Sequence, residues 1–143
     1  MTAKPVVCIF PHSDDEFSNT DDLRDFLTDK LPSEERGGEY LLRQLGWKDE
    51  DFKARVVPDS LVLFRKRGVI VGDAVVKKPI IELIPPEEGI YYHKIVFEPK
   101  SIRVYRTDIY ISRIEAWAGR RVYARFYAIV GLREDYEKTF IPI

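Results

Sequence analysis

The sequence predicts a single α+β domain built on a curled, mostly antiparallel β-sheet or small barrel with one main helix. Three observations lead to this prediction. The chain has 143 residues and a mass of 16.7 kDa, which suits one domain. Short apolar segments follow one another at spacings too tight for the crossover helices of a parallel sheet. Only one segment has clear helical periodicity, and no repeat or linker divides residues 1–143.

The first third of the chain predicts a strand, the main helix and a short extended segment. Residues 4–10 are an apolar run followed by a proline, as expected of a buried strand. Residues 20–31 repeat leucine and phenylalanine at helical spacing, with Thr20 as the expected N-cap and Pro32 after the last turn. The apolar run around residues 40–43 is too short for its pattern to distinguish a helix from a strand. We expect these residues to be extended.

The rest of the chain is rich in predicted strands. Residues 60–65 and 69–77 indicate a hairpin with a turn at 66–68, and Gly72 indicates a bulge or a close backbone approach. Further strands are expected at residues 80–84, 91–98, 102–105, 109–111 and 121–130, and a short helix at 112–118. Four aromatic residues are expected in the core: Phe26, Trp47, Phe64 and Phe126.

Composition excludes several classes of protein. With 45% hydrophobic and 33% charged residues, the chain is neither disordered nor of low complexity. It has no apolar run of the roughly 18 residues that a membrane span needs and no basic and apolar leader, so we expect a cytoplasmic protein with no membrane partner. One cysteine, Cys8, and two histidines exclude an internal disulfide and a zinc finger built from those residue types.

Charge is distributed unevenly along the chain. Residues 1–51 hold 13 acidic and 6 basic side chains, whereas residues 52–143 hold 11 acidic and 17 basic ones. The segment 100–125 carries seven cations against Asp108 and Glu115. Such an excess suits an anionic partner such as nucleic acid, and a solvated face with no partner is the alternative.

A polar string after the first strand resembles a metal-site motif. Residues 11–16 (PHSDDE) are similar to the His-Pro-Asp-Asp-Glu signature of zinc-dependent amide deacetylases of the PIG-L type, with Ser13 in place of the proline. The resemblance implies zinc ligands at His12 and Asp15 and a general base at Asp14, and His93 or a carboxylate would complete the site. The alternative is a polar loop leading into an acidic helix start.

A longer resemblance covers the middle of the chain. Residues 58–75 (PDSLVLFRKRGVIVGDAV) look like the hairpin of PUA-like domains, the superfamily that includes EVE, ASCH, YTH and SRA domains. Residues 38–43 are similar to a glycine-aromatic-arginine segment before that hairpin in the N-terminal specificity domains of some HNH restriction endonucleases. Residues 92–97, 101–105 and 114–117 keep the order of such domains. The resemblance implies a PUA-like fold over the chain.

Such domains read nucleic acids, so the resemblance implies recognition of a modified base in DNA by an aromatic pocket beside a basic groove. The expected pocket takes its walls from Tyr40, Tyr91, Tyr92, Tyr110 and Trp117, and Tyr105 is a further ring of this kind. The expected phosphate contacts are Arg65, Lys66, Arg67, Arg103 and Arg106. Asp73 either accepts from a base edge or bonds the backbone.

Cys8 lies in an apolar run and is expected in the core, and no pattern of nucleophile and base, phosphate loop or dinucleotide fingerprint is present in the sequence. We therefore expect a binding module without its own catalytic centre or cofactor, with nucleic acid as its partner and a separate nuclease module as a second one. Two further binding modes stay open at this point. The fold could read RNA, or it could bind protein through an apolar surface patch.

Overall fold

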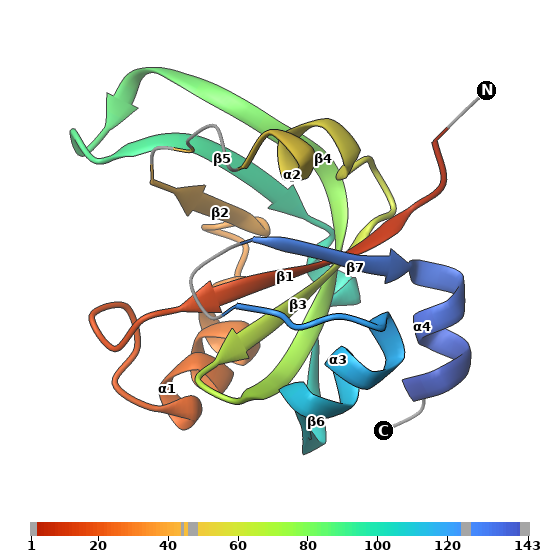
Figure 1. The fold of residues 1–143 in the computed structure, drawn as a ribbon. Helices are drawn as coiled ribbons and strands as arrows, with labels where there is room; N and C mark the ends of the chain where they lie inside the picture. Colours follow the sequence, from red (N-terminus) through yellow and green to blue (C-terminus); the bar gives the residue numbers. More distant parts are fainter. Residues whose placement is uncertain (1–2, 44, 46–48, 124–126, 141–143) are drawn as a thin grey trace.

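The computed structural model describes residues 3–43, 45, 49–123 and 127–140, which fold as one curled sheet with short helices around it (Figure 1). The strands are β1 (Val6–His12), β2 (Glu39–Leu42), β3 (Leu61–Lys66), β4 (Val69–Glu87), β5 (Tyr91–Phe97), β6 (Arg103–Tyr110) and β7 (Ala128–Leu132). The helical segments are α1 (Thr20–Asp25), η1 (Phe26–Lys30), α2 (Glu50–Arg55), η3 (Pro99–Ser101), α3 (Ile111–Ala118) and α4 (Arg133–Phe140).

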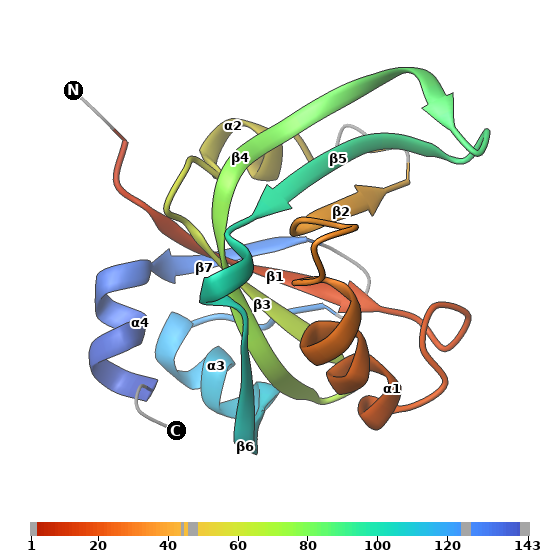
Figure 2. The ribbon, with the colours of Figure 1, turned by 180° about the vertical axis from the view of Figure 1, so that it is seen from behind.

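The sheet has the strand order β2-β5-β4-β3-β1-β7, and β6 also pairs with β4. All pairs are antiparallel except β1 with β3, so the expected mostly antiparallel sheet is confirmed. The two end strands β2 and β7 do not pair with each other, so the described sheet curls without closing into a barrel. Seen from behind, β4 and β5 curve away together from the strands that cross the centre (Figure 2).

Side chains of the central strands are buried on both faces of the sheet. Along β1, Cys8 and Phe10 face one apolar cluster with α1 and β2, whereas Val7 and Ile9 face a second cluster with α3 and α4. Two buried faces explain why β1 and β3 are continuous apolar runs with no polar alternation. Cys8 is fully buried, and burial raises the pKa of its thiol, which fits a core residue and not a nucleophile.

The main helix lies where the sequence predicts it, but its cap differs. Asn19 is the N-cap, because its side chain accepts from the backbone N–H of Asp22, and Thr20 is the first helical residue. The helix continues from α1 into the π-helical turn η1, which ends at Lys30. Leu23 and Leu27 are buried against the sheet, as the helical spacing predicts.

Several other elements differ from the sequence predictions. The strands expected at 69–77 and 80–84 are one strand, because Pro79 lies in a register irregularity of β4 where no ladder hydrogen bond is needed. Likewise, the two strands expected at 102–105 and 109–111 are the single strand β6. Of the strand expected at 121–130, only Ala128 onward is β7, and residues 121–123 are irregular. The sequence did not predict α2 or α4.

Other predictions are confirmed at the level of single residues. Gly72 lies at a register shift between β4 and β6, and a Cβ atom there would lie 2.2 Å from the backbone oxygen of Arg103. Phe64 is fully buried and Phe26 packs against the core. Trp47 and Phe126 lie outside the described residues. No helix in the described part of the chain is long and apolar enough to cross a membrane.

Candidate functional site

The carboxyl ends of the two parallel strands bring the two polar motifs of the sequence together. β1 and β3 pair so that Pro11 lies opposite Arg65 and His12 lies opposite Lys66. The loop after β1 and the turn after β3 therefore start side by side, at the kind of sheet edge where parallel strands form binding sites. They share one pocket of about 490 Å³, lined by Pro11, His12, Ser13, Asp14, Glu16, Arg65, Lys66, Arg67 and Tyr127.

His12 forms the buried wall of this pocket. Its Nδ1 lies 3.0 Å from the backbone oxygen of Arg65, which can only accept, so Nδ1 carries the proton. Nε2 then accepts from the hydroxyl of Tyr40 at 2.5 Å. Burial lowers the pKa of His12 below its ordinary value, in agreement with a neutral ring. Both ring nitrogens are therefore engaged within the protein.

The carboxylate of Asp14 links the loop after β1 to the end of β3 and the turn that follows it. The Lys66 side chain is only 1% exposed, and its ammonium donates to a carboxylate oxygen of Asp14. The guanidinium of Arg67 lies 3.4 Å from both oxygens of the same carboxylate. The hydrogen bond from Lys66 and the charge of Arg67 lower the pKa of Asp14. Asp14 is therefore an anion held by two cations at the mouth of the pocket.

Arg65 bonds backbone oxygens within the protein and is not available to a ligand. It is buried, and it donates to the backbone oxygens of Arg67 at 2.6 Å and Val122 at 3.3 Å. Burial lowers the pKa of its guanidinium, although Glu115 opposes this effect. The contact with Val122 fixes residues 120–123 next to the end of β3.

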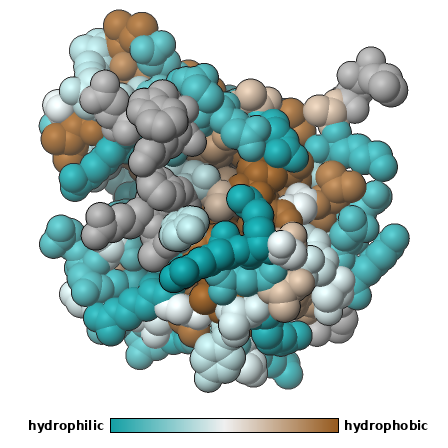
Figure 3. Space-filling view, viewed as in Figure 1, coloured by the Kyte–Doolittle hydropathy of each residue, from teal (hydrophilic) through white to brown (hydrophobic). Residues whose placement is uncertain are grey.

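A basic and aromatic surface adjoins the pocket. Tyr127 lines both this pocket and a neighbouring hollow of about 260 Å³, which Arg120, Arg121 and Tyr123 also line. One carboxylate, Asp51, lines this hollow too, and it is paired with Arg55. The guanidinium of Arg121 lies 5.4 Å from the ring centroid of Tyr123, and that tyrosine is 60% exposed. Figure 3 shows hydrophilic side chains crossing this face over the segment between α3 and β7. We name Arg67, Arg120, Arg121, Tyr123 and Tyr127 the arginine–tyrosine surface.

The packing beneath this surface fixes the ring of Tyr127. The ring of Tyr127 stacks on Phe52 of α2 at a centroid distance of 4.7 Å and meets Phe10 of β1 edge-on at 5.0 Å. In contrast, Arg120 and Arg121 are exposed, and neither makes an ion pair with another described residue. Arg120 donates to the backbone oxygen of Ile129. Two arginines held beside a fixed ring are suited to contact an anion that carries aromatic groups.

The aromatic residues expected in a base pocket lie in different places. Tyr40 and Tyr105 are buried in opposite core clusters, and Trp117 packs edge-on against Tyr136 and Phe140. Tyr110 is 67% exposed at the end of β6, whereas Tyr91 and Tyr92 are half-buried on β5. The structure does not bring these rings together around one described pocket.

The remaining expected phosphate contacts have other partners or other locations. Arg103 makes a two-pronged ion pair with the fully buried Asp73, at 2.7 and 2.8 Å. Tyr105 also donates to Asp73, which therefore bonds side chains and not a base edge. Burial raises the pKa of Asp73, and the bonds from Arg103 and Tyr105 oppose this rise. Arg106 is exposed on β6, outside the arginine–tyrosine surface.

Sequence reasoning did not single out Tyr123 and Tyr127. The signal was present, because arginines and tyrosines alternate with small and apolar residues over residues 120–127 (RRVYARFY). Aromatic residues interleaved with cations are a recognised signature of nucleic-acid contact. The arginines of this segment belong to the basic stretch 100–125 that suits an anionic partner, whereas residues 121–130 predict a strand. Arg125 in this segment lies outside the described residues.

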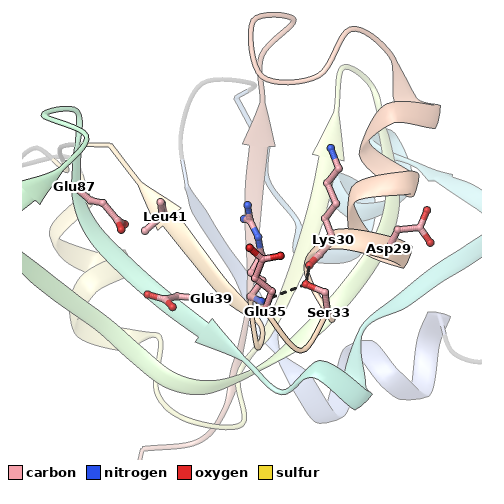
Figure 4. A pocket seen from close by; sticks show the side chains of 8 residues that line it. Asp29, Lys30, Ser33, Glu35, Glu39, Leu41 and Glu87 are labelled. Carbon is pink, nitrogen blue, oxygen red and sulfur yellow. Dashed lines mark hydrogen bonds between the residues drawn. The ribbon is translucent and has the colours of Figure 1, made fainter.

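A second hollow, of about 530 Å³, has the opposite charge character (Figure 4). The end of η1 and the turn after it line one side of this hollow, and β2 with the end of β4 lines the other. Its lining residues are Asp29, Lys30, Ser33, Glu35, Arg36, Glu39, Leu41 and Glu87. Four carboxylates against two cations disfavour a phosphate ligand here.

The residues of the zinc interpretation are not gathered as a ligand set. No group of three or more His, Cys, Asp or Glu side chains in the described ranges is arranged to hold a metal ion. His12 uses both ring nitrogens, Asp14 is paired with Lys66, Asp15 is exposed, and His93 lies on β5. The polar lining of the pocket combines two carboxylates, Asp14 and Glu16, with cations, a histidine and a tyrosine. Comparisons with known protein families, with curated proteins and with solved structures found no match.

Proposed function

We propose that the protein is a nucleic-acid-binding module, with a PUA-like architecture, that holds the phosphate backbone along the arginine–tyrosine surface. The observation that carries this proposal is that Arg120 and Arg121 lie exposed beside the 60% exposed ring of Tyr123, with no ion-pair partner among the described residues. Arginine binds phosphate oxygens in a two-pronged geometry, and an exposed tyrosine offers a face on which a base can stack.

The position of Arg67 extends this surface toward the pocket. Its side chain is 70% exposed at the β3–β4 turn, whereas Arg65 and Lys66 at the end of β3 are buried. Only one of these three successive cations is therefore directly accessible to a ligand. Replacing all three together would disturb buried contacts as well as binding, so the accessible arginines are the better targets.

The test is a comparison of oligonucleotide affinities, measured by fluorescence anisotropy, between the wild type and Arg120→Ala/Arg121→Ala. We expect the double variant to bind DNA about tenfold more weakly, because two phosphate contacts and their counterion release are lost. The matched control is Lys77→Ala/Lys78→Ala, which removes the same charge from exposed positions on β4. Equal loss in both double variants would contradict the assignment to this surface.

The same assay distinguishes the possible ligands. We expect duplex or single-stranded DNA to bind, and RNA of the same sequence is the alternative ligand. Preference for a modified base stays a prediction, tested with methylated and hydroxymethylated duplexes. Tyr123→Ala should lower affinity for single strands more than for duplexes, because only unstacked bases can reach its ring.

A further inference from the structure

The two side chains of the Lys66–Asp14 ion pair differ widely in exposure. The Lys66 side chain is 1% exposed, whereas that of Asp14 is 65% exposed. A buried ammonium ion is strongly destabilising unless a counter-charge lies against it. Here the counter-charge comes from a turn in the loop between β1 and α1, and not from a neighbouring strand. The cation is therefore part of the sheet, whereas its anion is carried by a surface loop.

The geometry around Asp14 matches that of a bound oxyanion. Lys66 Nζ donates to one carboxylate oxygen, and Arg67 approaches both oxygens at 3.4 Å. Ammonium and guanidinium groups converge in this way on two oxygens of a phosphate group. Because Asp14, Lys66 and Arg67 all line the pocket of about 490 Å³, a phosphate that replaced the Asp14 carboxylate would lie within that space.

Other groups of the pocket are already engaged. Both ring nitrogens of His12 and the guanidinium of Arg65 are bonded within the protein. Glu16 accepts from the backbone N–H and the hydroxyl of Ser13, at 3.2 and 3.3 Å. Lys66 and Arg67 are therefore the two cationic donors of the pocket that become available when Asp14 leaves.

We propose that Lys66 and Arg67 form a binding site for a phosphate monoester, and that Asp14 occupies this site when no ligand is bound. Since the pocket and the arginine–tyrosine surface share Tyr127, the terminal phosphate of a bound strand is the expected source, a point that rests on the proposed function. A free nucleotide or inorganic phosphate carries the same chemical group.

The experiment compares single strands of one sequence that carry a 5′-phosphate, a 3′-phosphate or only hydroxyl ends. We expect the wild type to bind one phosphorylated strand more tightly than the hydroxyl strand. Asp14→Asn should widen this preference by about tenfold, because it removes the negative charge that holds this side chain against Lys66 and Arg67. Lys66→Met should abolish the preference, and the exposed Arg67→Gln should reduce it, which keeps the test valid if Lys66→Met does not fold.

The control is Asp15→Asn, which removes the same charge from the next residue of the loop. If Asp15→Asn widens the preference as much as Asp14→Asn, occupation of the site by Asp14 is overturned. Absence of any preference in both the wild type and Asp14→Asn, together with no binding of inorganic phosphate to Asp14→Asn by calorimetry, overturns the site itself.

The two proposals fail in different ways in these measurements. Binding of the hydroxyl strand that depends on Arg120 and Arg121, with no effect of a terminal phosphate and no binding of inorganic phosphate to Asp14→Asn, rejects the phosphate site and leaves the proposed function standing. Binding of inorganic phosphate to Asp14→Asn, with no binding of any strand, supports the phosphate site and rejects the strand as its source.

Discussion

His12 is the residue whose ionisation bears most directly on the pocket. Its ring lies among Phe17, Tyr40 and Phe64, with centroid distances between 5.4 and 5.9 Å. The neutral ring donates through Nδ1 and accepts through Nε2, and a second proton would reverse the bond, so that Nε2 donates to the Tyr40 oxygen. Burial among these rings disfavours the charged form, so the neutral ring is the form that suits the buried wall of the pocket.

This assignment predicts a pH dependence of stability. Burial lowers the pKa of His12 from the ordinary value of 6.5, so the unfolded chain binds a proton before the folded chain does. The free energy of unfolding should therefore fall as the pH drops below about 6.5. Urea unfolding at pH 7.5 and 5.5 should show a larger loss for the wild type than for His12→Asn, whose amide can still donate to the Arg65 oxygen. Equal losses in both proteins would contradict a buried neutral His12.

Single residues also show where sequence reasoning succeeds and where it stops. The role of Gly72 was predictable, because a glycine inside an apolar strand indicates a close backbone approach. The burial of Arg65 and Lys66 was not predictable, because three successive cations at a turn favour exposure. Their burial depends on the pairing of β1 with β3, which joins segments more than 50 residues apart.

At the scale of elements, β4 and β6 are joined by a buried polar network. Arg103 pairs with Asp73, and Tyr105 bonds both Asp73 and Tyr136 of α4. The network connects two strands and the last helix described in the structure. The carboxylate of Asp73 is fully buried, so it depends on these partners for its charge to be tolerated.

Removal of one partner of Asp73 should therefore lower the free energy of unfolding. Arg103→Met leaves a buried carboxylate without its counter-charge, and we expect the free energy of unfolding to fall by about 2 kcal/mol. The loss is limited to this size because Arg103 is partly exposed, so water can partly replace it. This loss of stability should be smaller at pH 5 than at pH 7.5, because protonation of Asp73 removes the uncompensated charge. Arg106→Met, on the same strand with an exposed side chain, is the control and should change stability by less than about 0.5 kcal/mol. Equal effects of the two changes in urea unfolding would contradict a structural role for this pair.

Most of the strands and the main helix could be predicted from the sequence, because apolar runs and helical spacing are local signals. The helix α4 could not, since only Tyr136 and Phe140 mark its buried face among charged residues. A six-residue helix such as α2, with Phe52 alone buried, gives no periodic pattern. The candidate site was only partly predictable, because it combines a loop, a turn and an irregular segment that only the folded sheet brings together.

At the scale of the whole molecule, the net charge of −1 gives no general attraction to nucleic acid. The acidic first part and the basic remainder of the chain partly neutralise each other in the fold, as Asp14 does with Lys66 and Glu39 does with Lys94. Binding to a polyanion must therefore come from a local surface. Arg67, Arg120 and Arg121 form such a surface, and the acidic hollow shown in Figure 4 shares none of its lining residues with it.

The salt dependence of DNA affinity tests this central claim most directly. On duplex DNA each lost phosphate contact changes the slope of log Kd against log salt concentration by roughly 0.9. We predict that Arg120→Ala/Arg121→Ala lowers the slope by about 1.8 relative to the wild type, whereas Lys77→Ala/Lys78→Ala leaves it unchanged. A wild-type slope near zero, or the same slope in all three proteins, would contradict a phosphate-binding role for the arginine–tyrosine surface.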